Sequence, residues 1–274
     1  IGLVGHWRLD EGSGNVFVDD SGFGNNAILV NPKDVVWSPG QIGQSVYLPS
    51  TTNRFARAGH SESLSVSGAL TVSGWIRPRN TSLDRVILMK GDPGGYQLRI
   101  AKTGKVQVLL TSSTGSNYTL SSQTDYPVDG STWMHVAVTF DGTKIAMYIN
   151  GFKESELSVP ASLIRQSTSD LIIGANSSST GRWIGDLDDL RLYNRALNEA
   201  EIGTLLNKVI EAPGVPMLRS PANASTEVPL NAALEWEESE FAAKYILQVA
   251  ENIGFTSGLQ TFEDIVGTSF GQMI

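Results

Sequence analysis

Residues 19–27 (DDSGFGNNA) gather oxygen-bearing side chains between two apolar runs. Calcium takes six to eight oxygen ligands from carboxylates, amide side chains and backbone carbonyls held on a tight loop. Asp19 and Asn25 offer such oxygens, and Gly22 lets the backbone curl round an ion. The same residue types also form ordinary turns, in which Asp and Asn side chains bond to nearby backbone. The residues alone therefore leave two interpretations open, a plain turn and one half of a metal site.

Catalytic chemistry has little support in the sequence. Hydrolysis of a glycosidic bond needs two carboxyl groups flanking that bond. The segment GDLDDLRLY at residues 185–193 offers aspartates with no glutamate among them. The three histidines lie in separate segments, and the chain has no cysteine. We therefore expect a protein that is not an enzyme.

The elements that must position these residues are short strands. Apolar and polar residues alternate in segments such as QSVYL, YQLRIA, KVQVLLT and KIAMYIN, and turn sequences such as DPGG, KTGK and DGT separate them. A period of two predicts strands with one buried face, and the Gly-rich links predict hairpins. One short helix is expected at residues 197–209, where Asn198 and Glu201 form a capping-box pattern. Many short strands beside one helix predict an all-β sandwich or barrel.

Composition and charge exclude two classes of partner. The chain has 274 residues, of which 41% are hydrophobic and 18% charged, as in an ordinary globular protein. Its net charge of −8 argues against nucleic acid, because phosphate binding needs clustered Lys and Arg. No apolar run approaches the ~18 residues of a membrane span. We therefore expect neither nucleic-acid binding nor membrane insertion.

Three segments resemble the laminin-G-like, concanavalin A-like jelly-roll domains of bacterial secreted proteins. They are LVGHWRLDEGSGNVFVDDSGFGNNAIL, STWMHVAVTFDGTKIAMYINGF and GRWIGDLDDLRLYNRALNEAEI. They occur in the order of that family's opening strands, central hairpin and closing strand. The resemblance implies a concanavalin A-like jelly-roll sandwich of two antiparallel sheets over residues 1–208. It also implies a secreted, extracellular protein at a cell surface.

The rest of the chain predicts a second, smaller part. The segment EAPGVP places two prolines around a glycine, which predicts a Pro/Gly linker over residues 209–216. The sequence SPANASTEVPLNAALEWEESEFAAKYILQVAENIGF resembles the first strands of a fibronectin type III-like module. We therefore expect a truncated fibronectin type III-like β segment over residues 217–274.

The resemblance also implies one structural calcium ion. Asp19 and Asn25 match the ligand positions of the family's opening loop, and Asp188 matches the first aspartate of its closing strand. A backbone carbonyl near Gly22 completes the expected shell. Alternation along the strand places Asp188 on the inward face, where an unpaired carboxylate is costly and needs an ion or a partner. The calcium would tie the opening loop to the closing strand.

A sugar site needs an aromatic ring for the apolar face of the sugar and planar polar groups for its hydroxyls. Trp183 and Trp37 lie in polar loops and are the candidate rings. Gln97, Arg99 and Gln107 alternate with core residues, so they face outward and are candidate hydrogen-bonding groups. A plain solvated face is the alternative interpretation of these three side chains.

The sequence therefore predicts a non-catalytic extracellular recognition module that binds a glycan or polysaccharide. It would be part of a larger secreted enzyme or of a surface adhesin. The alternative is a protein-binding or purely structural module of a cell-surface adhesin, whose partner would be a surface protein. A polysaccharide-active enzyme is the third hypothesis.

Overall fold

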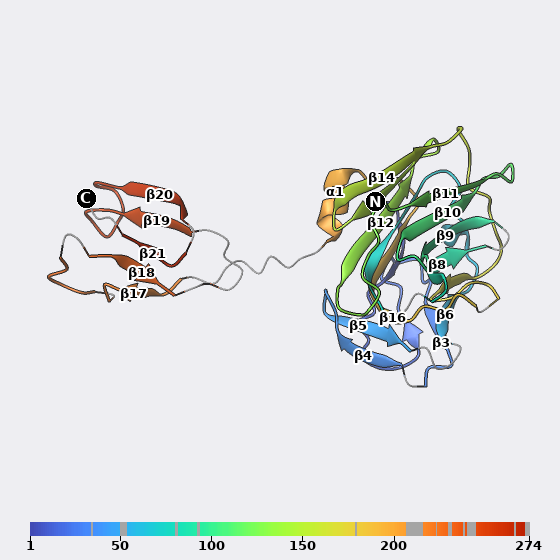
Figure 1. The fold of residues 1–274 in the computed structure, drawn as a ribbon, viewed down its shortest axis with the longest axis horizontal. Coiled ribbons are helices and arrows are strands. Elements are labelled where there is room, and N and C mark those ends of the chain that lie inside the picture. Colours follow the sequence, from blue (N-terminus) through green and yellow to red (C-terminus); the bar gives the residue numbers. More distant parts are fainter. Residues whose placement is uncertain are drawn as a thin grey trace. The chain divides into compact units, whose positions relative to one another are not determined.

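The computed structural model describes residues 1–33, 35–49, 54–79, 82–91, 94–178, 180–206, 216–222, 224–229, 232–237, 239, 245–265 and 267–271. The chain divides into two compact units, residues 1–207 and residues 208–274. The first unit holds two large antiparallel sheets, which we call sheet A and sheet B (Figure 1).

Sheet A contains the closing strand and the central hairpin. Its strands are β1 (Leu3–Trp7), β4 (Val36–Pro39), β5 (Gln44–Leu48), β7 (Leu70–Pro78), β12 (Met134–Phe140), β13 (Lys144–Ile149), β14 (Phe152–Ser158) and β16 (Gly185–Tyr193). Their order is β14-β13-β12-β7-β16-β5-β4, and β1 also pairs with β16. The closing strand β16 therefore has β7 on one side and both β5 and β1 on the other.

Sheet B has the same number of strands. They are β2 (Val16–Phe17), β3 (Ala27–Val30), β6 (Phe55–Ala58), β8 (Arg85–Lys90), β9 (Gly95–Ile100), β10 (Val106–Thr111), β11 (Asn117–Ser121) and β15 (Leu171–Ile173). Their order is β11-β10-β9-β8-β15-β6-β3-β2. Strands β8 to β11 follow one another in sequence and in space, as the short turn segments between them require.

The main hydrophobic core draws residues from both sheets. Leu98 and Val108 of sheet B belong to it together with Val136 and Leu190 of sheet A. Alternate residues of β9 and β10 thus face inward, as a period of two predicts. This arrangement confirms the predicted all-β sandwich of two antiparallel sheets.

The described residues of the first unit also form two short helical segments, namely the 3₁₀ turn η1 (Glu62–Leu64) and the helix α1 (Glu199–Leu205). The Asn198 side chain accepts a hydrogen bond from the Glu201 amide at 3.0 Å, and the Asn198 amide donates to Glu201 Oε2 at 2.9 Å. This reciprocal cap satisfies two backbone donors at the start of the helix. The capping pattern in the sequence therefore marks the true start of α1.

The second unit is also built of strands. They are β17 (Leu218–Ser220), β18 (Leu234–Trp236), β19 (Tyr245–Val249), β20 (Gln260–Ile265) and β21 (Ser269–Phe270). They form a sheet of order β17-β18-β21 and a β19-β20 pair. The fibronectin type III-like identity of this unit stays a prediction. Residues 209–215 of the predicted linker lie outside the described residues.

Within the described part of the chain, no helix has the length and apolarity that a membrane span requires.

Candidate functional site

Strands β8, β9 and β10 place outward-facing side chains side by side on sheet B. Because Leu98 and Ile100 of β9 belong to the core, Gln97 and Arg99 between them face away from it. The register of the three strands aligns these two residues with outward neighbours on both sides. The two cross-strand rows are Met89–Gln97–Leu109 and Val86–Arg99–Gln107.

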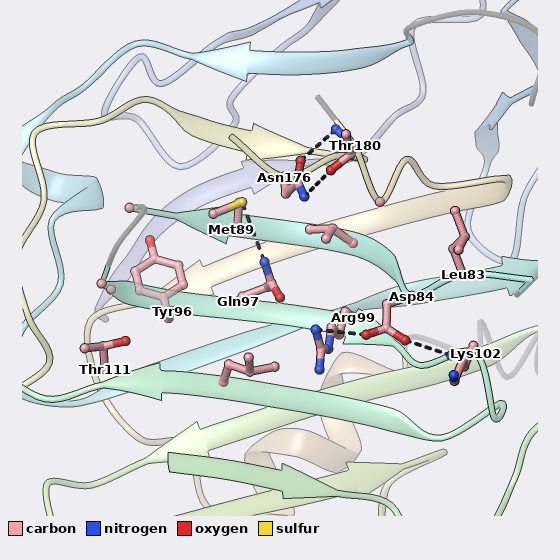
Figure 2. Close-up of a pocket in the computed structure, with 16 residues that line it drawn as sticks. Leu83, Asp84, Met89, Tyr96, Gln97, Arg99, Lys102, Thr111, Asn176 and Thr180 are labelled. Carbon is pink, nitrogen blue, oxygen red and sulfur yellow. Dashed lines mark hydrogen bonds and ion pairs between the residues drawn. The ribbon is translucent and has the colours of Figure 1, made fainter. Parts of the chain in front are cut away.

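An open groove of about 630 Å³ lies over these rows, and of their six residues all but Gln107 line it (Figure 2). Its strand part is lined by apolar side chains from Val86, Met89 and Leu109 and by the polar side chains of Gln97 and Arg99. Loop residues form the rim, namely Leu83, Asp84, Lys102, Asn176, Thr180 and Gly181. The groove therefore combines an aliphatic floor with a polar border.

Arg99 is held in place by two neighbours. Its Nη1 lies 3.0 Å from Asp84 Oδ2, and its Nε donates to Gln107 Oε1 at 3.0 Å. Asp84 Oδ1 in turn accepts a hydrogen bond from the Lys102 backbone amide at 3.0 Å. These contacts fix the plane of the guanidinium group, so its remaining N–H donors point in defined directions.

Among the described residues, the Gln97 side chain makes one weak contact. Its Nε2 lies 3.7 Å from the sulfur of Met89, which is a weak acceptor. Figure 2 shows this contact across the groove floor, next to the rim pair Asn176 and Thr180. The Asn176 side chain is closed on Thr180, donating to its Oγ1 at 2.7 Å and accepting from its amide at 2.7 Å. Among the described residues of the groove, Gln97 and the remaining N–H groups of Arg99 are therefore the planar donors open to a ligand.

Trp183 does not belong to the groove, and its prediction as a sugar platform is wrong. Its side chain is 1% exposed and lies in the main core. The Trp183 amide donates to Gly174 O at 2.8 Å, and the next carbonyl, of Ile184, accepts from the Arg79 amide at 2.9 Å. Residues 183 and 184 are therefore hydrogen-bonded to Gly174 and to Arg79 before β16 begins. In this position the Trp183 ring points into the core.

Trp37 is half-buried in β4 of sheet A, whereas the groove lies on sheet B. Its ring packs edge-to-face on Phe17 at 5.9 Å and rests against the main core. Of the five predicted ligand residues, the structure therefore brings together Gln97, Arg99 and Gln107. The role of these three in binding stays a prediction.

The groove also contains three residues that were not predicted from the sequence, namely Asp84, Lys102 and Met89. The first two lie in turns, where no periodicity marks a functional residue. A signal for Met89 was present, because RVILMK in β8 is apolar at inward and outward positions alike. Such a run predicts a strand with partners on both faces.

The opening loop is organised by the Asp19 carboxylate. Its Oδ1 accepts from the backbone amides of His6 at 2.8 Å and Ser21 at 3.0 Å. Its Oδ2 accepts from Ser21 Oγ and from the Asn25 amide, both at 2.8 Å. Gly22 between them has φ +88, which favours glycine. The loop is thus closed on Asp19 by four hydrogen bonds.

Asn25 is similarly occupied. Its Nδ2 donates to Val4 O at 2.8 Å and to Ser63 Oγ at 2.9 Å, and its Oδ1 accepts from Ser61 Oγ at 2.6 Å. The side chain therefore ties the opening loop to β1 and to the η1 turn. Asp19 and Asn25 lie together, as the calcium hypothesis requires, yet protein donors already bind their oxygens.

Asp188 contacts a different loop. Its Oδ2 accepts from the backbone amides of Gln41 at 2.7 Å and Ile42 at 2.9 Å. A bulge interrupts β16 after Asp188, and Asp189 has φ +49 there. The bulge resets the alternation, so Leu190 enters the core while Asp188 aligns with Trp75 outside the main core. The expectation that Asp188 shares the inward phase of Leu190 is therefore wrong.

These donors do not fit one shared calcium ion. Asp19 and Asn25 bond to the opening loop, to β1 and to the η1 turn, whereas Asp188 bonds to residues 41 and 42. Within the ranges that the structure describes, no three His, Asp or Glu side chains are grouped so that they could hold a metal. Calcium binding stays a prediction of the family resemblance, and no step below depends on it.

Asp188 has a further consequence for stability. Burial raises the pKa of its carboxyl group from 3.8 to about 7, and its Oδ1 is buried with no partner among the described residues. Between about pH 4 and pH 7, the Asp188 carboxyl group therefore holds a proton in the folded state that it has released in the unfolded state. Stability from this group is complete below about pH 4 and is lost as the pH rises to about 7.

We expect Asp188→Asn to remove this pH dependence. Its amide oxygen can accept from the residue 41 and 42 amides without carrying a charge. The original protein should lose about 2–3 kcal/mol of unfolding free energy from this group between pH 5 and pH 8, and the variant should not. The difference in unfolding free energy, variant minus original protein, should therefore increase by the same amount over this range. Chemical denaturation at both pH values measures this change.

The exposed Asp125, paired with Lys105 at 3.4 Å, provides the control variant Asp125→Asn. An equal change in both variants would contradict the assignment to Asp188.

The fold and its groove define a class, the jelly-roll sandwiches with an open site on one sheet. Residues 39–203, more than half of the chain, match the family described as the concanavalin A-like lectin/glucanases superfamily, in its laminin G group. The chain therefore belongs to this family.

The relatives are similar in fold and more distant in sequence. Paraclostridial mosquitocidal protein 1 of Paraclostridium bifermentans is 26% identical over 205 residues, which are 67% of this chain and 16% of that protein. The crystal structure of its binding domain has a TM-score of 0.64 and 19% identity, and the match covers 90% of this chain and 58% of that one. Domain 4 of the extracellular arabinanase AbnA from Geobacillus stearothermophilus, solved with arabinotriose, has a TM-score of 0.60 and 18% identity. That match covers 75% of this chain and 98% of the arabinanase domain. This chain thus spans a small part of its curated relative.

Proposed function

We propose that the first unit is a non-catalytic extracellular binding module that holds a glycan in the groove on sheet B. The observation that carries this proposal is the pairing of an aliphatic floor with fixed planar donors. The half-buried Leu109, beside the largely buried Met89, offers surface to the C–H face of a sugar, and Arg99 and Gln97 offer donors to its hydroxyls. The floor would take the role predicted from the sequence for a tryptophan ring.

The relatives support a binding role. The mosquitocidal protein's matched structure is a binding domain, and domain 4 of the arabinanase was solved with an arabinose trisaccharide. The second match covers nearly all of that domain, so the likeness concerns a separate module of a larger extracellular enzyme. On this basis we propose that this chain also serves as a module of a longer secreted or surface protein.

The number of carboxylates described in the groove favours binding over hydrolysis. Among the described lining residues, Asp84 supplies the one carboxylate, and it is occupied by Arg99 and by the Lys102 amide. Glycoside hydrolysis requires a second carboxyl group about 5–10 Å away. We therefore propose a module without hydrolytic activity of its own.

We expect Arg99→Gln to weaken sugar binding by about 10-fold to 100-fold. The change removes charge-assisted hydrogen bonds, each of which contributes about 1.5–3 kcal/mol. A glycan array that includes arabinan oligosaccharides identifies a ligand, and calorimetric titration of that ligand measures both affinities. Gln97→Ala should reduce the affinity less, because it removes a neutral partner.

Arg8→Gln is the matched control. Arg8 is an exposed arginine paired with Asp20 at 2.7 Å, and it lies outside the groove. Binding that is unchanged by Arg99→Gln, or equally weakened by Arg8→Gln, would contradict the proposed site. A folded protein that binds no glycan of the array would instead favour a protein partner.

A further inference from the structure

A second group of polar side chains lies on sheet A, on the opposite sheet from the groove. Strand register places Tyr47 of β5, Asp186 of β16 and Arg77 of β7 next to one another in one row. Leu187 and Ile76 adjoin this row and belong to the main core, so the row faces away from it. The strands β5 and β16 that carry two of the three residues are seen side by side in Figure 1.

Asp186 binds two arginines through one oxygen. The Nε atoms of Arg77 and Arg79 each donate to Asp186 Oδ2 at 3.1 Å. Asp186 is fully buried, and its Oδ1 has no partner among the described residues. A buried carboxylate needs compensation, but one arginine would balance its charge. The second arginine leaves a surplus positive charge at this place.

Both guanidinium groups are also fixed by aromatic rings. The Arg77 Cζ atom lies 4.8 Å from the ring centre of Trp133, and the Arg79 Cζ atom lies 4.6 Å from that of Tyr47. Stacking of this kind orients the guanidinium plane and limits its motion. The arginine side chains are nevertheless 23% and 42% exposed. Each uses its Nε for Asp186, and no residue that the structure describes accepts a hydrogen bond from the Nη groups.

The turn beside this pair carries one further carboxylate, that of Asp129. The adjoining turn contains Gly130, which packs closely on Arg79, and its Asp129 accepts a hydrogen bond from the Ser131 amide at 2.9 Å. The chain as a whole carries a net charge of −8. Salt at physiological strength screens exposed charges beyond about 8 Å, so a local pair can still attract an anion.

We propose that Arg77 and Arg79 form an anion-binding site for the carboxylate or sulfate group of an acidic ligand. The ligand's oxygens would accept hydrogen bonds from the Nη groups, and its carbon skeleton would lie against Trp133 and Tyr47. A guanidinium fork matches the planar geometry of a carboxylate, which makes a uronic acid the best fit by chemistry. This site is separate from the groove and does not depend on its function.

The test uses the whole chain and two anionic probes. Sodium glucuronate and sodium sulfate are titrated at constant ionic strength, with methyl glucoside as the neutral control, and affinities are taken from calorimetry or NMR shifts. We expect glucuronate to bind more tightly than methyl glucoside, and Arg79→Gln to weaken its affinity by about tenfold. Sulfate binding with the same loss would identify a general oxyanion site.

Arg57→Gln is the matched control for this site. Arg57 also stacks on an aromatic ring, Phe55 at 5.1 Å, and pairs with Asp170 at 3.7 Å, but it lies on sheet B. Its variant should bind both probes as the original protein does. Thermal unfolding of each variant shows that it is folded. Absence of anion binding, or binding that Arg79→Gln leaves unchanged, would overturn the proposal and leave the arginines a purely structural role.

Discussion

Asp19→Ala is expected to lower the unfolding free energy of the first unit by about 3–5 kcal/mol. The change leaves the amides of His6, Ser21 and Asn25 without their acceptor in a buried loop. Each buried donor without a partner costs about 1–3 kcal/mol. Guanidinium chloride denaturation, followed by tryptophan fluorescence, measures the loss.

The neighbouring residue provides the control for Asp19. Asp20 is 40% exposed and makes one surface ion pair with Arg8, so Asp20→Ala should change stability by less than about 1 kcal/mol. Equal losses for the two variants would contradict the central role of Asp19. Repeating the series with calcium and with EDTA tests the predicted metal. A loss that is the same in both buffers supports a loop held by hydrogen bonds, and a loss confined to calcium buffer supports a metal site.

Trp183→Ala is expected to destabilise the first unit by about 3–5 kcal/mol while leaving the groove intact. The ring is among the largest fully buried side chains, and removing it leaves a cavity in the main core. The same denaturation experiment measures this loss, and titration at a temperature where the variant is folded measures its ligand affinity. Trp37→Ala, at a half-buried ring, should cost less. A Trp183→Ala protein of unchanged stability that no longer binds sugar would contradict the buried position.

Local pattern explains the parts of this fold that could be predicted from the sequence. Alternation in YQLRIA and KVQVLLT places Leu98 and Val108 inward and Arg99 outward, because neighbouring residues of a strand face opposite sides. The start of α1 followed from the pairing of Asn198 with Glu201 three residues later. Each of these features depends on residues that are close in sequence.

Features that depend on distant partners could not be predicted in the same way. Alternation fails at Asp188, because the bulge beside it changes the phase of β16. Trp183 follows a polar loop in the sequence, but its amide bonds to Gly174 and the next carbonyl accepts from the distant Arg79, and its ring lies in the main core. The pairing of Arg99 with Asp84 likewise arises from the register of β8 and β9, which the sequence does not state.

The central claim is that a glycan binds over β8, β9 and β10. Backbone amide NMR shifts, recorded while a glycan from the array is added to the isotope-labelled chain, locate the ligand directly. We expect the largest shifts at Gln97, Arg99 and Leu109 and around Asn176, with saturation that fits one site, and we expect Arg99→Gln to remove them. Shifts confined to sheet A, or to the second unit, would contradict the proposed function.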